Sequence, residues 1–198
     1  MADQRREPNR KDRQRKAASA AKPLEWMNRV LLVEPSDDLR QTIKAVIAPK
    51  EQGRCHILAM GNGFDAITVL EDNLRKGRSF DAVVIDKRPS VGVKDFLDML
   101  EKTMIQVNTV VRTIVVIPVC DAEWQTKGVS DEIERFHEAH RKARTVPRLM
   151  VSRPKDKYKL YSHFPDVIER VLRGLAASRM QLEIQLAKQD GGKSGRNG

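Results

Sequence analysis

The sequence predicts an α/β fold in which helices cover both faces of a parallel β-sheet. Two observations predict it. Short apolar runs of strand length alternate along the chain with longer segments whose apolar residues recur at the helical period. The runs are apolar throughout, as in strands that are covered on both faces, and a helical pattern follows each of them.

Five strands are predicted. The run from Ala82 to Ile85 is the clearest, because four apolar residues in succession end on a carboxylate, Asp86. Ligands of parallel sheets bind outside the carboxyl ends of the strands, so the residues that follow each run are candidates for a site. The remaining predicted strands are Val30–Val33, His56–Met60, Thr113–Val119 and Arg148–Ser152.

The helices are predicted between these strands. The segment that starts at Asp37 repeats apolar residues at the helical period, at Leu39, Ile43, Val46 and Ile47. A polar helix over 131–144 begins with acidic and ends with basic residues, which complements the helix dipole. Further helices are predicted around Ala66, from Phe96 and from Pro165.

The chain divides into three predicted parts: a disordered basic arm over 1–27, a folded domain over 28–179, and a helix extension with a flexible tail over 180–198. Residues 1–22 hold eight Lys and Arg against three acidic residues, and no Val, Ile, Leu or aromatic residue. The arm is either a solubilising tail or a segment whose charges attract nucleic acid, an anionic lipid surface or an acidic partner. The length of the last helix leaves a docking role or a homodimer open.

Several classes of protein are disfavoured. No apolar run approaches the ~20 residues that span a membrane, and the N-terminus has no apolar signal-peptide core. Two cysteines without an export signal are typical of reduced thiols in a cytoplasmic protein. The glycine patterns of nucleotide-binding loops do not follow the first strand, and no nucleophile elbow or HExxH motif is present, so we expect no enzyme.

The motifs, in their order, resemble the receiver domain of two-component response regulators, over about residues 28–179. RVLLVEPSDDLRQTIKAVI resembles the family's first strand, acidic turn and first helix, and GNGFDAITVLE resembles the turn and helix after the second strand. FDAVVIDKRP and MVSRPKD resemble the segments after the third and fifth strands. The resemblance implies a flavodoxin-like (CheY-like) topology with five parallel strands, and a role in two-component signal transduction or a phosphorelay.

The resemblance also implies a site. Asp86 stands at the phospho-acceptor position, and Glu34 with Asp86 would hold Mg²⁺, a cation that prefers carboxylate and phosphate oxygens. Pro35 replaces the second carboxylate of the family's acidic pair. Pro118 stands at the position of the hydroxyl that takes part in switching. Arg153 stands at the position of the lysine and is the candidate for contact with phosphate.

This partial set favours a degenerate receiver (a pseudo-receiver) that acts as a protein–protein interaction module. Its partner would be a sensor kinase or a larger assembly. The alternative is a phospho-accepting regulator that uses Asp86 with Mg²⁺. A further alternative is a protein that associates with nucleic acid through its basic termini.

Candidate partner-binding residues lie in two segments. Trp124 stands in a polar stretch, AEWQTKG, and is either packed onto the domain or an exposed anchor for a partner. The other segment is basic and follows the fifth strand. It is either a solvated loop or a surface for an acidic or nucleic-acid partner, and its candidates are Arg153, Lys155, Lys157 and Lys159.

Overall fold

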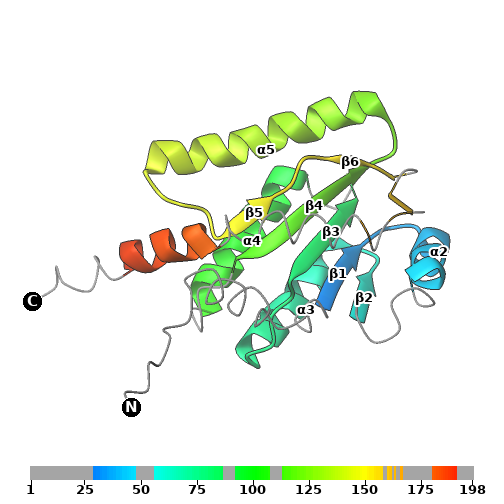
Figure 1. Cartoon of the computed structure of the whole chain (residues 1–198), viewed down its shortest axis with the longest axis horizontal. Helices are drawn as coiled ribbons and strands as arrows, with labels where there is room; N and C mark the ends of the chain where they lie inside the picture. Colours follow the sequence, from blue (N-terminus) through cyan, green and yellow to red (C-terminus); the bar gives the residue numbers. More distant parts are fainter. Residues whose placement is uncertain are drawn as a thin grey trace, which may run out of the picture.

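The computed structural model describes residues 29–47, 56–86, 92–107, 113–157, 160–161, 163, 166 and 180–190. A parallel sheet with the strand order β2-β1-β3-β4-β5 forms its centre, and a short strand, β6, also pairs with β4 (Figure 1). This order is that of flavodoxin-like folds and confirms the predicted fold class. The strands are β1 (Arg29–Val33), β2 (His56–Met60), β3 (Ala82–Asp86), β4 (Ile114–Cys120), β5 (Leu149–Val151) and β6 (Lys155–Asp156).

Four helices connect these strands in the described part of the chain: α2 (Asp37–Ile47), α3 (Gly63–Arg75), α4 (Val93–Val107) and α5 (Glu123–Ala143). Residues 180–190 form a further helix, which we call the C-terminal segment. The basic arm at 1–27, most of the predicted last helix before residue 180, and residues 191–198 lie outside the described residues. Within the described ranges, no helix has the length and apolarity that crossing a membrane requires.

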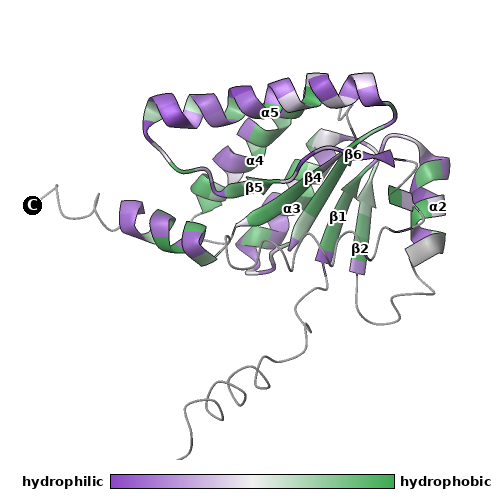
Figure 2. Cartoon of the chain, turned by 45° about the horizontal axis from the view of Figure 1, so that its top comes forward, coloured by the Kyte–Doolittle hydropathy of each residue, from purple (hydrophilic) through white to green (hydrophobic). Residues whose placement is uncertain are grey.

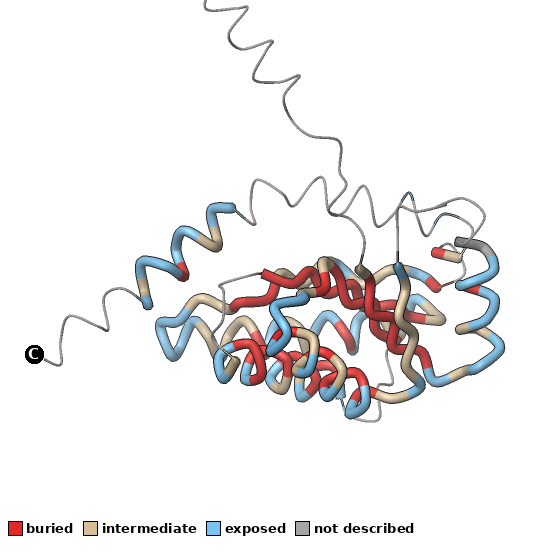
Figure 3. The backbone as a smooth tube through the Cα atoms, turned by 90° about the horizontal axis from the view of Figure 1, so that it is seen from below, coloured by how far each residue is buried: buried red, intermediate tan, exposed pale blue. Residues whose placement is uncertain are grey.

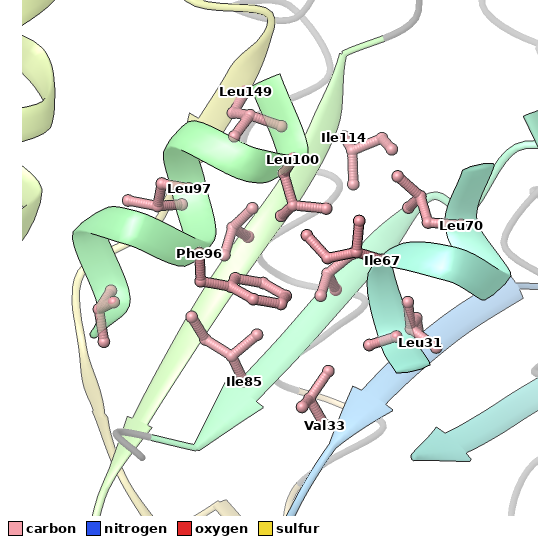
Figure 4. Close-up of a cluster of buried hydrophobic side chains, with 14 of the residues drawn as sticks. Leu31, Val33, Ile67, Leu70, Ile85, Phe96, Leu97, Leu100, Ile114 and Leu149 are labelled. Carbon is pink, nitrogen blue, oxygen red and sulfur yellow. The ribbon is translucent and has the colours of Figure 1, made fainter. Parts of the chain in front are cut away.

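The sheet separates two apolar clusters because successive side chains of a strand point to opposite faces. Leu31, Val33 and Ile85 point toward α3, α4 and α5 and meet Phe96 and other helix residues there (Figure 4). Alternate strand residues, such as Leu32, pack on the other face in a smaller cluster that includes a residue of α2. The central strands are almost entirely buried, as Figure 3 shows, which explains why their sequences are apolar throughout.

Helix α5 starts at Glu123, about two turns before the predicted start at Asp131. Val129 and Phe136 are buried and seven residues apart, so both anchor the same side of the helix to the core. This anchoring extends the helix through Gly128, although glycine disfavours a helix interior by about 1 kcal/mol. Most other residues of α5 are polar, and Figure 2 shows its largely hydrophilic exterior.

Strands β5 and β6 form one edge strand that a bulge interrupts. Val116 of β4 pairs with Val151, and Val119 of β4 pairs with Lys155. Two residues of β4 therefore lie opposite the three residues 152–154, so the edge strand carries one extra residue. The predicted single strand over Arg148–Ser152 is thus divided into two shorter strands.

Pro118 explains the position of this bulge. Within β4, the N–H of Val115 donates to the Asp81 carbonyl on the β3 side (3.2 Å), whereas the Val116 carbonyl accepts from Ser152 N on the edge side (2.8 Å). Residue 118 has the same orientation as Val116, so its nitrogen faces the edge strand. Because proline has no N–H, it cannot donate to that strand, and the ladder is interrupted there.

The C-terminal segment packs against the amino edge of the sheet, where β4 and β5 begin. Leu186 is buried, and the Asp190 carboxylate forms an ion pair with Arg148 (2.8 Å). Side chains of the segment also accept hydrogen bonds from backbone N–H groups next to the strands, from Val146 to Gln189 Oε1 (3.4 Å) and from Thr113 to Glu183 Oε1 (3.5 Å). The segment is thus attached through polar bonds and one buried leucine.

Candidate functional site

Three carboxylates meet one ammonium at the carboxyl edge of the sheet. Lys157 Nζ lies 2.7 Å from Glu34 Oε2, 3.1 Å from Asp86 Oδ2 and 3.3 Å from Asp121 Oδ1. Glu34 follows β1, Asp86 ends β3 and Asp121 follows β4, so the parallel strands bring the three acids together. We call these four residues the Lys157 cluster.

The cluster is largely removed from solvent. Lys157 is 5% exposed, Glu34 3% and Asp86 7%, whereas 37% of the Asp121 side chain is exposed. Burial by itself would lower the pKa of Lys157, but the hydrogen bonds and charges of Glu34 and Asp86 outweigh it and raise that pKa above its ordinary value. Lys157 therefore remains a cation at neutral pH, and it holds the negative charges of the cluster together.

The turn after β1 fixes Glu34. Arg40 in α2 donates to the Glu34 carbonyl (2.5 Å) and to the Pro35 carbonyl (3.0 Å), and it pairs with Asp37 (2.8 Å). Gly61, after β2, permits this arrangement, since a Cβ there would lie 3.2 Å from Arg40 Nη1. Asp37 is consequently exposed and held by Arg40, so it does not supply the carboxylate that Pro35 replaces.

The neighbours of Asp86 on β4 carry no hydroxyl. Asp86 pairs in register with Val119, and Pro118 pairs with Ile85. By the alternation of the strand, Val119 shares the face of Asp86, whereas Pro118 belongs to the opposite face. Neither residue can donate a hydrogen bond from its side chain to a group on Asp86.

Two buried oxygens of this region have no hydrogen-bond partner among the described residues: Asp86 Oδ1 and the Tyr161 hydroxyl. Burial raises the pKa of Tyr161, and Lys157, Glu34, Asp121 and Asp86 all act on its titration, so the phenol lies beside the Lys157 cluster.

The residues present do not fit the Mg²⁺ site that the resemblance implies. Glu34 Oε2 contacts Lys157, and Glu34 Oε1 accepts the Ser36 N–H (3.0 Å), so both oxygens are engaged. Asp86 Oδ2 also contacts Lys157. Among the described residues, no group of three or more His, Cys, Asp or Glu side chains is arranged to hold a metal ion.

The structure brings together only part of the predicted site. Glu34 and Asp86 lie in one cluster, but the cation there is Lys157, and Arg153 is exposed on the bulge. Lys157 is thus a buried member of the site, not a surface residue for a partner. Trp124 is 75% exposed on α5, Lys155 is half-buried in β6, and Lys159 lies outside the described residues.

Sequence reasoning missed the role of Lys157 and missed Asp121 altogether. The motif MVSRPKD placed Arg153-Pro154 at the lysine position because no extra residue was assumed in the edge strand. The basic side chain that reaches Asp86 is Lys157, four positions after Arg153, and the bulge accounts for one of these positions. Two signals in the sequence were available. One is Pro118 within a central strand. The other is Asp121 directly after β4, in the same place relative to its strand as the acids at the ends of β1 and β3.

Comparison with solved structures finds the same architecture. A two-component response regulator from Legionella pneumophila matches with a TM-score of 0.50 and 14% identity, over 73% of this chain and 97% of that one. A response regulator from Cytophaga hutchinsonii matches with a TM-score of 0.51 and 15% identity, over 75% and 98%. No protein-family model and no curated protein sequence matches the chain. At this identity the likeness concerns the fold, and the described chain has the CheY-like receiver fold.

Proposed function

We propose that this protein is a degenerate receiver, a non-enzymatic regulatory module that binds a protein partner without phosphorylation of Asp86. The absence of a hydroxyl on the β4 residues next to Asp86 carries this proposal. Val119 is the register partner of Asp86 and Pro118 precedes it, so neither of these β4 residues has a hydroxyl that could bond a phosphoryl group and change position with it. A partner would therefore recognise a surface that does not depend on phosphorylation.

The loss of the second acid after β1 supports the same proposal. Pro35 has no ligand atom, and Asp37 is held away by Arg40. Phosphoryl transfer to a carboxylate depends on cations that neutralise the charge developing on the phosphoryl oxygens. Here the carboxylates that could attract a second cation already share Lys157.

One observation favours the alternative, a phospho-accepting regulator. Asp86 ends β3 at the carboxyl edge, Lys157 contacts it, and its Oδ1 has no partner among the described residues. A lysine in this position supplies the positive charge for which sequence reasoning had only Arg153. A candidate acceptor and one cation are therefore present, and a direct test of phosphorylation separates the two functions.

Incubation with acetyl phosphate and Mg²⁺, followed by intact-mass measurement, is that test. We expect wild type and Asp86→Asn to show the same mass before and after incubation. A gain of one phosphoryl group in wild type that Asp86→Asn abolishes would overturn the proposal in favour of the alternative. A gain that persists in Asp86→Asn reports modification elsewhere and leaves Asp86 unmodified, as proposed.

A further inference from the structure

The number of carboxylates around Lys157, and the strand ends that supply them, indicate that the acids of the cluster bind a cation. Three acids from three different strand ends share one ammonium, so carboxylates outnumber cations among the four residues of the cluster. Two of the acids are almost completely buried. Carboxylate oxygens are the ligand atoms that a hard cation prefers, but here the three carboxylates surround the ammonium and are not arranged to hold a metal ion. Asp121, the third member, follows β4, where the resemblance predicted no ligand.

We propose that the Lys157 ammonium is the resident cation of this site and takes the place of a divalent metal. Its shortest contact is to Glu34, whose second oxygen accepts the Ser36 N–H, so both oxygens of Glu34 already have partners. Asp86 keeps one oxygen without a described partner. A single such oxygen cannot replace several of the six oxygens that surround Mg²⁺.

The position of Lys157 follows from the edge strand. Val119 pairs with Lys155 only after the bulge, and this register places Lys157 two residues beyond the pair, at the carboxyl edge. The chain thus delivers an ammonium to the centre of the acids as a fixed part of the fold. In consequence the wild-type site does not depend on divalent cations, and it becomes a divalent-cation site when the ammonium is removed.

The experiment is a titration with Mn²⁺, followed by electron paramagnetic resonance of the free ion and by thermal unfolding, at ionic strength matched with NaCl. The proteins are wild type, Lys157→Met and the control Lys155→Met, which removes a nearby lysine from β6. We expect no binding in the millimolar range by wild type or the control. Lys157→Met should bind at least about tenfold more tightly and gain thermal stability with Mn²⁺ beyond the effect of NaCl.

A second variant covers the case in which Lys157→Met fails to fold. Lys157→Gln also removes the charge but retains a hydrogen-bond donor for the carboxylates. Recovery of folding by Mn²⁺ in either variant supports the proposal, and the loss of that recovery in Lys157→Gln/Asp86→Asn places the ion at this site. Failure of Mn²⁺ to bind or stabilise both variants overturns it.

Binding of Mn²⁺ by wild type that Asp86→Asn abolishes would also overturn the proposal, since the ammonium would then not replace the metal. This inference concerns the same site as the proposed function and rests on it to that extent. Different experimental results would overturn the two proposals. Mn²⁺ binding by wild type without a phosphoryl mass gain would leave the degenerate receiver intact. A phosphoryl gain at Asp86 without measurable Mn²⁺ binding would leave the resident cation intact.

Discussion

The two edges of the sheet bury charge in opposite ways. At the carboxyl edge, a lysine is surrounded by three carboxylates and keeps its charge. At the amino edge, the Glu101 carboxylate is buried and accepts the Arg148 backbone N–H with both oxygens, at 2.8 Å each. The Arg148 side chain turns instead to Asp190 of the C-terminal segment.

The difference appears in the titration of the two groups. Burial raises the pKa of Glu101 to about 7, although the Arg148 N–H and charge oppose this. Lys157 is buried as well, but its partners more than compensate, and its pKa lies above the ordinary value of 10.5. Direct ion pairs thus preserve a buried charge at the carboxyl edge, whereas one backbone donor does not at the amino edge. Near neutral pH the charge of Lys157 therefore stays constant, whereas the charge of Glu101 changes.

Lys157→Met should give the largest effect. Removing the cation leaves buried carboxylates without compensation, so we expect a loss of about 3–5 kcal/mol in the free energy of unfolding, measured with urea. A lysine with a raised pKa stabilises the fold fully below its ordinary value of 10.5, so the ionisation of Lys157 should not change the wild-type stability between about pH 6 and about pH 8. Lys155→Met should lose no more than about 1 kcal/mol. Equal losses in both variants would contradict the special role of Lys157.

Glu101→Gln should give a smaller effect that changes with pH. A carboxyl group with a raised pKa stabilises the fold below its ordinary pKa of 4.5, and this contribution is lost as the pH rises through about 7. The variant does not titrate, so between about pH 5 and about pH 8 it should gain about 1–3 kcal/mol relative to wild type. Urea unfolding at several pH values measures this. A difference independent of pH would show that Glu101 titrates normally.

Much of the fold was predictable because it depends on local patterns. Ala82–Ile85 is apolar throughout since both faces of β3 are covered, and this pattern also placed Asp86 at the end of the strand. Glu34 was predicted for the same reason. The start of α5 was not predicted, because Gly128 and the polar residues around it do not show a helical pattern. Val129, which is buried in the core, holds this part of the helix in place.

The centre of the site was beyond local patterns. Whether Arg153 or Lys157 reaches Asp86 depends on the pairing between β4 and the edge strand, and this pairing changes where Pro118 lacks an N–H. Asp121 can be recognised as part of the site only when the ends of β1, β3 and β4 are known to lie side by side. Both the cation that contacts Asp86 and the place of Asp121 therefore depend on contacts between segments that are far apart in the sequence.

Asp190→Ala should weaken the amino edge by less than about 1 kcal/mol, because its ion pair with Arg148 is partly exposed to solvent. We expect faster amide hydrogen exchange in residues 180–190 and unchanged exchange in β3. Lys188→Ala, at another exposed position of the segment, is the matched control. Faster exchange in β3 would show that the two edges of the sheet are coupled.

Trp124→Ala should have the smallest effect on stability, within about 0.5 kcal/mol, because the side chain is largely exposed. The same variant sharpens the proposed function, since an exposed tryptophan that anchors a partner would affect binding without affecting folding. Urea unfolding provides the first measurement. A loss well above 1 kcal/mol would mean that the indole packs on the domain and is not available to a partner.

The bulge at residues 152–154 changes the register between the edge strand and β4 by one residue. Before it, a residue of the edge strand lies opposite the β4 residue 35 positions earlier, as for Val151 and Val116; after it, the offset is 36, as for Lys155 and Val119. Any gap-free alignment across this point assigns the wrong side chains to the carboxyl edge. Relatives with a proline at the position of Pro118 are therefore best aligned with an insertion opposite it, and a lysine engineered at position 153 should not substitute for Lys157.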